Sequence, residues 1–218
     1  MKLTRRQLRK TIKGIILQEG MKMPERLPAD IVVVINYTKS PELLIHYAKI
    51  DENGEIDDEA SNFRPMGYLV MSLDTKNLSY GMPSSGPCGN AATVKNTVVT
   101  KGWGPLLYDV AIEVASSEAS GLIADRDSVS LDAWNVWNNY MIRSDGKSND
   151  VDYVQLDDLD NTLTRDWEDN CDQDVASLDK NSYDWTASPL SKMYIKNTTP
   201  MMDKLDELGK LYKIGSQQ

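Results

Sequence analysis

Four apolar runs in the first half of the chain have patterns that are typical of strands, at residues 30–38, 42–50, 66–74 and 91–100. The first is β-branched and nearly continuous, the second alternates between apolar and polar positions, and the fourth is rich in Thr and Val. Asn53-Gly54 follows the second run and indicates a hairpin turn, because both residues tolerate positive φ. This half of the chain therefore predicts antiparallel hairpins.

The pattern changes to helical spacing after residue 104. Apolar residues recur on one face over residues 105–119, with Pro105 in the first turn, where a helix tolerates proline. A short strand at 121–126, a second helix at 128–143, strands at 150–158 and 188–196, and a helix at 202–213 follow. We expect an α/β (α+β) fold, in which helices flank a mixed, largely antiparallel central sheet, with residues 20–218 forming one domain.

The first 19 residues differ in charge and pattern from the domain that follows them. Their apolar positions fall near helical spacing with basic residues between them, which predicts a short basic amphipathic leader helix. Six basic residues and one acidic residue give the leader a net charge of +5 within a chain total of −9, so the remainder carries −14. Because residues 20–218 are strongly acidic, they repel nucleic-acid phosphates, and only the leader is suited to contact them.

Several classes of protein are disfavoured by composition. No run of 18 or more apolar residues is present, so we expect no membrane span. One histidine, His46, and two distant cysteines, Cys88 and Cys171, do not make a metal site. We expect His46 to be packed in a strand and the setting to be a reducing cytosol; whether the cysteines pair stays open. The acidic stretch at 156–179 lacks the glycine of a calcium loop, which indicates a solvated loop.

The stretch "KGWGPLLYD" (101–109) joins the fourth predicted strand to the first long helix. Gly102 and Gly104 let the backbone approach a ligand closely. The free N–H groups at the start of a helix, together with its dipole, favour a negative group. The stretch therefore predicts either a tight structural turn or a cradle for an anion.

The order of elements over residues 91–156 resembles the GNAT superfamily of acetyl-CoA-dependent N-acetyltransferases. In that family a glycine loop opens a helix and holds the coenzyme A pyrophosphate. The resemblance implies an acetyl-CoA site formed by Val98, Val99, Lys101, Gly102, Trp103, Gly104, Leu106 and Asn135. Val99 departs from the family pattern, which has Gln or Arg at that place, and Lys101 is a candidate replacement for the missing charge.

The resemblance also implies catalytic groups. The family has a tyrosine near the end of the following helix, and Tyr140 falls near that place as the acid that protonates the leaving thiolate. A backbone amide within Val94–Val99 is expected to polarise the thioester carbonyl. Asp125 and Glu113 are the candidate bases, although we expect Glu113 on the solvent face of its helix. Alternatively, Tyr140 simply packs against neighbouring aromatic residues.

The leader ends in Leu17-Gln18-Glu19-Gly20, which resembles the sites cut by prohead proteases of large tailed phages. In those phages, short leaders direct internal proteins into the capsid. This implies a phage protein, cleaved after Glu19, with the prohead protease and the capsid as partners and with the host cytoplasm or the virion interior as its location. The alternative is an ordinary first helix lying across the domain.

Together the two resemblances imply a phage-encoded N-acetyltransferase that uses acetyl-CoA and an unidentified amine, either a small molecule or a protein. Two alternatives stay open. One is a non-catalytic virion or internal head protein that keeps the GNAT fold. The other is an inhibitor that presents its acidic surface to a host enzyme.

Overall fold

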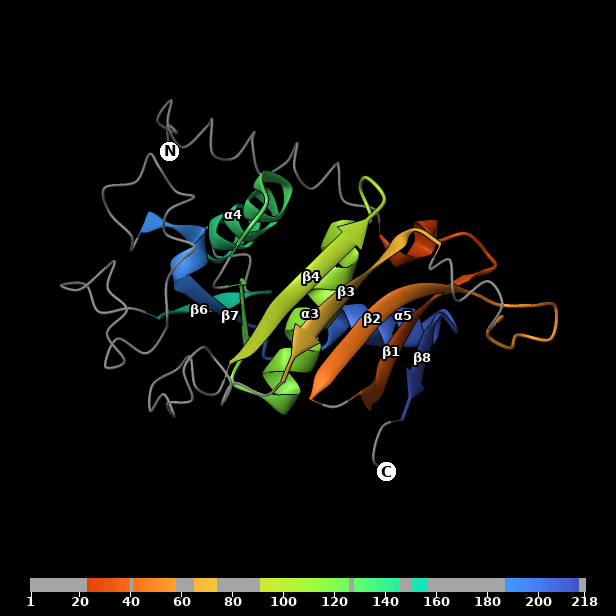
Figure 1. Ribbon diagram of the computed structural model, residues 1–218. Coiled ribbons are helices and arrows are strands. Elements are labelled where there is room, and N and C mark those ends of the chain that lie inside the picture. The colour runs from red at the N-terminus through yellow and green to blue at the C-terminus, as the bar shows by residue number, and fades with distance from the viewer. Residues whose placement is uncertain are drawn as a thin grey trace.

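The computed structural model describes residues 23–39, 41–57, 65–73, 91–125, 128–145, 150–156 and 187–215. Helix and strand labels follow Figure 1, including gaps in their numbering. The leader with Glu19 and Gly20, both cysteines, and all of the predicted acidic stretch except Leu156 lie outside the described residues. No helix within the described ranges is long and apolar enough to cross a membrane.

One eight-stranded sheet organises the described chain, in the order β6-β7-β5-β4-β3-β2-β1-β8. All neighbouring pairs are antiparallel except β1 with β8 and β4 with β5. The prediction of an α+β fold with a mixed, largely antiparallel sheet is confirmed. The strands are β1 (Ile31–Lys39), β2 (Glu42–Lys49), β3 (Gly67–Ser72), β4 (Ala92–Val99), β5 (Leu122–Ile123), β6 (Asp152–Gln155), β7 (Lys192–Ile195) and β8 (Leu211–Ile214).

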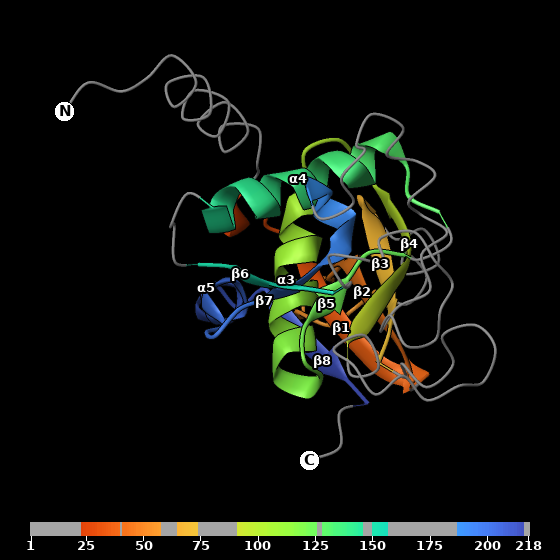
Figure 2. The same cartoon turned by 90° about the vertical axis from the view of Figure 1, so that its left-hand side faces the viewer.

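Three α-helices are described. Helix α3 (Gly104–Glu118) packs along one face of the sheet, and α4 (Leu131–Asp145) lies across one end of α3 (Figures 1 and 2). Helix α5 (Pro200–Glu207) packs against α3 farther along its length. Two 3-10 turns, η1 (Pro24–Arg26) and η7 (Pro189–Ser191), complete these elements.

The main hydrophobic core lies between the sheet and α3. Alternate residues of β1, such as Val33 and Ile35, point into it, whereas Val32 and Val34 belong to a smaller cluster on the opposite face. His46 of β2 lies opposite Val34 and is buried, as the sequence predicted for a packed strand histidine. The period-2 pattern of the first strands therefore fixes which side chains meet α3.

Helix α3 is buried on all sides from Leu106 to Ala115, and this corrects one expectation. Glu113 was expected on a solvent face, but its side chain is fully buried. One carboxylate oxygen lies 3.0 Å from the Lys196 ammonium, and the carboxylate accepts the backbone N–H groups of Met201 and Met202 at the start of α5. Glu113 therefore holds α5 against α3 and is not a base exposed to a substrate.

The C-terminal helix is shorter than the sequence pattern predicted. It ends at Glu207, and residues 211–214 form β8 beside β1 instead of continuing the helix. Gly209 has a φ of +64°, and hydrogen bonds run from Gly209 N–H to Asp206 and from Lys210 N–H to Leu205. This is the Schellman arrangement that ends helices at a glycine.

Candidate functional site in the cleft between strands β4 and β5

Strands β4 and β5 lie side by side only at their beginnings. Ala92 pairs with Leu122 and Thr93 with Ile123 in parallel register, and β5 then ends while β4 continues to Val99. Among the described strands, the edge of β4 that faces away from β3 therefore has no neighbour beyond Thr93. Backbone N–H and C=O groups on such an edge are able to pair with a bound molecule.

β4 carries a bulge close to the point where its pairing with β5 ends. Asn96 lies opposite Val70 of β3 and Val94 lies opposite Met71, so Lys95 is the extra residue between two paired positions. A bulge bends its strand and raises the local twist. The bulge follows directly after the last pair with β5, so the bend lies where β4 continues without that neighbour.

The outer part of the cleft is a cavity of about 560 Å³ over the loop between β4 and α3. Val99, Lys101, Gly102 and Gly104 line it from the loop side, which brings together four of the residues predicted to bind acetyl-CoA. The region that opens α4 supplies the opposite wall, through Ser130, Asp132, Ala133 and Val136.

The loop has the conformation that its glycines suggested. Gly102 has a φ of +87°, and Trp103 N–H donates to the Thr100 carbonyl oxygen at 3.1 Å, which closes a tight turn. A Cβ added to Gly104 would meet no atom within 4 Å. Trp103 stands at the N-cap of α3 and makes no side-chain capping hydrogen bond. The first N–H groups of α3 are thus left to solvent or to a ligand, and they suit an anion.

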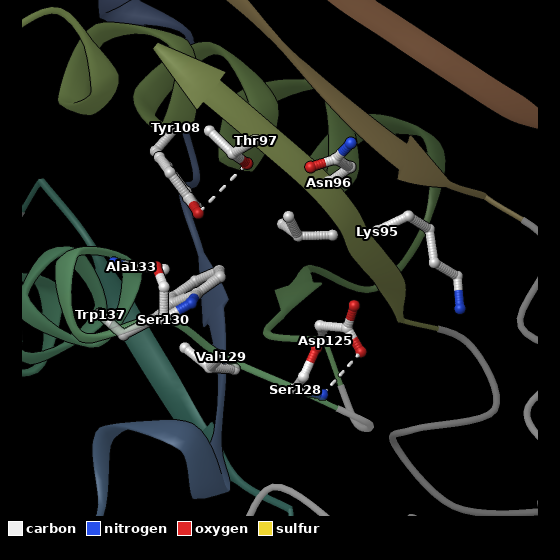
Figure 3. A pocket seen from close by; sticks show the side chains of 11 residues that line it. Lys95, Asn96, Thr97, Tyr108, Asp125, Ser128, Val129, Ser130, Ala133 and Trp137 are labelled. Atoms are coloured by element: carbon white, nitrogen blue, oxygen red, sulfur yellow. Dashed lines mark hydrogen bonds between the residues drawn. The ribbon is translucent and has the colours of Figure 1, made fainter. Parts of the chain in front are cut away.

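The inner part of the cleft is a cavity of about 210 Å³ with a polar group at each end (Figure 3). At one end the Thr97 hydroxyl (Oγ1) donates to the Tyr108 hydroxyl oxygen at 3.3 Å, which leaves the phenol's own proton available. At the other end Asp125 Oδ1 accepts the backbone N–H of Ser128 at 3.4 Å. A phenol from α3 and a carboxylate two residues beyond β5 therefore line the same space.

The Tyr108 phenol is held in its protonated form. Burial is the main cause and raises its pKa above the ordinary value of 10.0. The hydrogen bond to Thr97 opposes this effect, and the negative charge of Asp125 adds to it. At neutral pH, Tyr108 is thus able to donate a proton into the cavity.

The other residues predicted to bind acetyl-CoA lie elsewhere. The side chain of Val98 is 55% exposed and lines neither cavity, because alternate residues of β4 point to opposite faces. Trp103 and Leu106 are buried in the core, which leaves only their backbone groups for a ligand. Asn135 is exposed on α4 and also lines neither cavity.

The two predicted catalytic residues differ in position. Asp125 lines the inner cavity. Tyr140 lines neither part of the cleft and is 1% exposed, packed against Trp137 and Tyr194. Its hydroxyl donates to the Pro105 carbonyl oxygen at 3.3 Å. Tyr140 thus contacts the backbone of the glycine loop from the side of the core.

Tyr108 and Thr97 were missed as site residues. Tyr108 follows Gly104 by four residues, so the two share one face of α3, and this spacing was the available signal. Thr97 precedes Val99 by two residues in β4, which places both on one face of the strand.

No group of three His, Cys, Asp or Glu side chains in the described ranges is placed to hold a metal ion. The chain matches no protein-family model, and neither a curated protein nor a solved structure matches it. The function is therefore argued from the cleft itself.

Proposed function

We propose that this protein is an N-acetyltransferase of the GNAT type, which transfers the acetyl group of acetyl-CoA to an amine. The observation that carries the proposal is the divergence of the parallel strands β4 and β5 after Thr93, which leaves the rest of β4 without that neighbour up to the loop that opens α3. It places a free strand edge, an uncapped helix start, a phenol and a carboxylate around one cleft. The resemblance of residues 91–156 to that superfamily supports the same assignment.

The outer cavity suits the coenzyme A part of the donor. Its helix start offers amide donors to a diphosphate, and Lys101 at its edge supplies positive charge. The open space at Gly104 lets a phosphate approach the backbone, since no Cβ intervenes. The pantetheine arm carries amide groups, which are able to pair with the free edge of β4 between Val94 and Val99.

The inner cavity suits the transfer itself. Asp125 accepts the proton that the attacking amine loses, and the new C–N bond forms at the thioester carbonyl carbon. A backbone N–H of the free β4 edge stabilises the negative charge on the carbonyl oxygen. When the C–S bond breaks, the Tyr108 hydroxyl gives its proton to the leaving thiolate. Tyr108 takes this role in the proposal because it lines the cavity, whereas Tyr140 does not.

Calorimetric titration with acetyl-CoA and with CoA tests the binding part of the proposal. We expect saturable binding at one site, and no heat and no thermal shift at millimolar ligand contradicts the proposal. Release of the CoA thiol in the presence of an amine panel, with polyamines, amino sugars and a lysine peptide, then tests the transfer. Binding without thiol release for any amine favours the non-catalytic alternative.

The predicted processing of the leader concerns residues outside the described structure, and we propose it on the sequence alone. Co-expression with a phage prohead protease is expected to yield a chain that begins at Gly20. Intact-mass measurement checks this, with Glu19→Ala as the control that resists cleavage. A chain that keeps Met1 beside an active protease contradicts it.

A further inference from the structure

Two buried tyrosine hydroxyls donate to backbone carbonyls next to Gly104, on the core side of the loop that opens α3. The first belongs to Tyr47 of β2, which is fully buried and donates to the Trp103 carbonyl oxygen at 2.8 Å. The rings of these two residues also meet edge to face, with centroids 5.9 Å apart. The carbonyl at the N-cap of α3 is thus fixed to the central part of the sheet.

The second hydroxyl belongs to Tyr140 of α4, which donates to the Pro105 carbonyl oxygen at 3.3 Å. Its ring lies between Trp137 and Tyr194, and the guanidinium of Arg143 sits 4.9 Å from the ring centroid. These contacts leave the Tyr140 ring little freedom. The first turn of α3 is therefore fixed to α4 as well as to the sheet.

Peptide geometry makes these two contacts relevant to the cleft. A trans peptide is planar, so the carbonyl of one residue and the N–H of the next point in opposite directions. A fixed Trp103 carbonyl therefore directs the Gly104 N–H, and a fixed Pro105 carbonyl directs the Leu106 N–H. Pro105 has no N–H, so these are the amide donors of the first three helical positions.

Both tyrosines remain donors over the working pH range. Burial raises the pKa of Tyr47 well above its ordinary value. Burial also raises the pKa of Tyr140; the negative charge of Asp109 and the hydrogen bonding of the phenol with that carboxylate raise it further, while Arg143 opposes the shift. Neither hydroxyl loses its proton near neutral pH, so both hydrogen bonds to the loop are retained.

We infer that Tyr47 and Tyr140 are positioning residues, which aim the Gly104 and Leu106 amides at the diphosphate of coenzyme A. The inference rests on the proposed function, because it assigns the occupant of the outer cavity. It gives Tyr140 a role that differs from the acid suggested by the sequence, since its hydroxyl acts on the loop and not on the reacting atoms. The energetic basis is preorganisation: the donors are aligned before the ligand arrives.

The test replaces each hydroxyl and keeps each ring, with Tyr47→Phe, Tyr140→Phe and the double variant. The matched control is Tyr194→Phe, because Tyr194 is equally buried and its hydroxyl donates to the Trp137 and Pro189 carbonyls, away from the loop. Calorimetry measures affinity for CoA, for ADP, which carries the diphosphate without the thiol arm, and for pantetheine, which lacks the diphosphate.

We expect each single variant to weaken CoA and ADP binding by roughly two- to tenfold, the effect of about one hydrogen bond, and the double variant to multiply the losses. Pantetheine binding is expected to stay unchanged, and so is CoA binding by Tyr194→Phe. Equal losses for CoA and pantetheine, or an equal loss in the Tyr194→Phe control, overturn the inference, because either result describes general loosening of the fold.

A second measurement covers the case in which a variant folds poorly. The Gly104 amide, observed by ¹⁵N glycine labelling of the wild-type chain, should shift strongly with ADP and remain still with pantetheine. A Gly104 amide resonance that does not shift when ADP is added overturns the inference. If the wild-type chain binds neither CoA nor ADP, the proposed function itself fails; if it binds both and the variants bind equally well, only the positioning role fails.

Discussion

The ammonium of Lys196 and the carboxylate of Glu113 form an ion pair 3.0 Å apart in the interior of the protein, where neither side chain is more than 2% exposed. The Lys196 ammonium also lies 2.7 Å from the carboxylate of Asp109, one turn earlier in α3. Arg143 of α4 contacts the same Asp109 carboxylate at 3.4 Å. These contacts connect α3 with α4 and with the segment that enters α5.

Removing one partner of this buried pair is expected to destabilise the fold strongly. Lys196→Met leaves the Glu113 and Asp109 carboxylates without their shared cation, which typically costs about 3–5 kcal/mol of unfolding free energy. Urea denaturation measures the change. The control is Lys204→Met, whose pair with Glu207 is exposed at 42% and 67%, so that its removal should leave the unfolding free energy nearly unchanged. Similar losses of unfolding free energy in both variants would contradict a stabilising role for the buried Lys196–Glu113 pair.

The stability of the protein should also carry a pH dependence that Glu113 causes. Burial raises the pKa of Glu113 above its ordinary 4.5, although Lys196 and the α5 amides oppose the shift. Just above pH 4.5 the folded chain therefore binds more protons than the unfolded chain, so this group's contribution to stability falls as pH rises through that window. Glu113→Gln should remove this part of the slope of unfolding free energy against pH. An unchanged slope contradicts the raised pKa.

Two glycines of the loop should respond differently to the same substitution. Gly104→Ala adds a methyl group that meets no atom within 4 Å, so unfolding free energy should change by less than about 0.5 kcal/mol while CoA affinity falls. Gly102→Ala places alanine at a φ of +87°. It should lower the unfolding free energy by about 1 kcal/mol in addition to lowering CoA affinity. Denaturation and calorimetry separate the two effects.

Gly209→Ala is the control for this pair. Gly209 has a φ of +64° and open space around it, but it ends α5 and lies outside the cleft. Stability should fall as it does for Gly102→Ala, with CoA affinity retained. A loss of CoA affinity in the Gly209 variant would show that affinity follows stability and not access to the loop.

The elements that the sequence predicted well are those with a local cause. The strand at residues 31–39 follows from its run of β-branched residues, and the start of α3 follows from Gly104 and Pro105. The end of α5 had a local cause too, since Gly209 is a helix-stopping residue, but the helical spacing of the apolar residues was extended through it. That error came from weighing periodicity above a glycine.

The features that the sequence did not predict depend on partners that are distant along the chain. Glu113 is buried because Lys196, 83 residues later, meets it. Amphipathic spacing alone places a glutamate in solvent. Tyr140 lies near the position that the family resemblance implied for an acid, but the crossing of α4 over α3 turns its hydroxyl toward Pro105. That crossing keeps Tyr140 out of the cleft, and no local pattern along α4 encodes it.

Tyr108→Phe is expected to reduce the rate of acetyl transfer by about 10²–10⁴-fold, the usual contribution of a general acid, while CoA affinity stays unchanged. The phenol must be protonated to act, and burial raises its pKa above 10.0, so the wild-type rate should not fall on the alkaline side until the pH passes that ordinary value. Rates of thiol release across a pH series measure both effects. Tyr153→Phe is the control, because Tyr153 lies on β6 and lines neither cavity of the cleft. Under the proposed function, a Tyr108→Phe variant that keeps the wild-type rate removes Tyr108 from the proton path and means that solvent protonates the leaving thiolate.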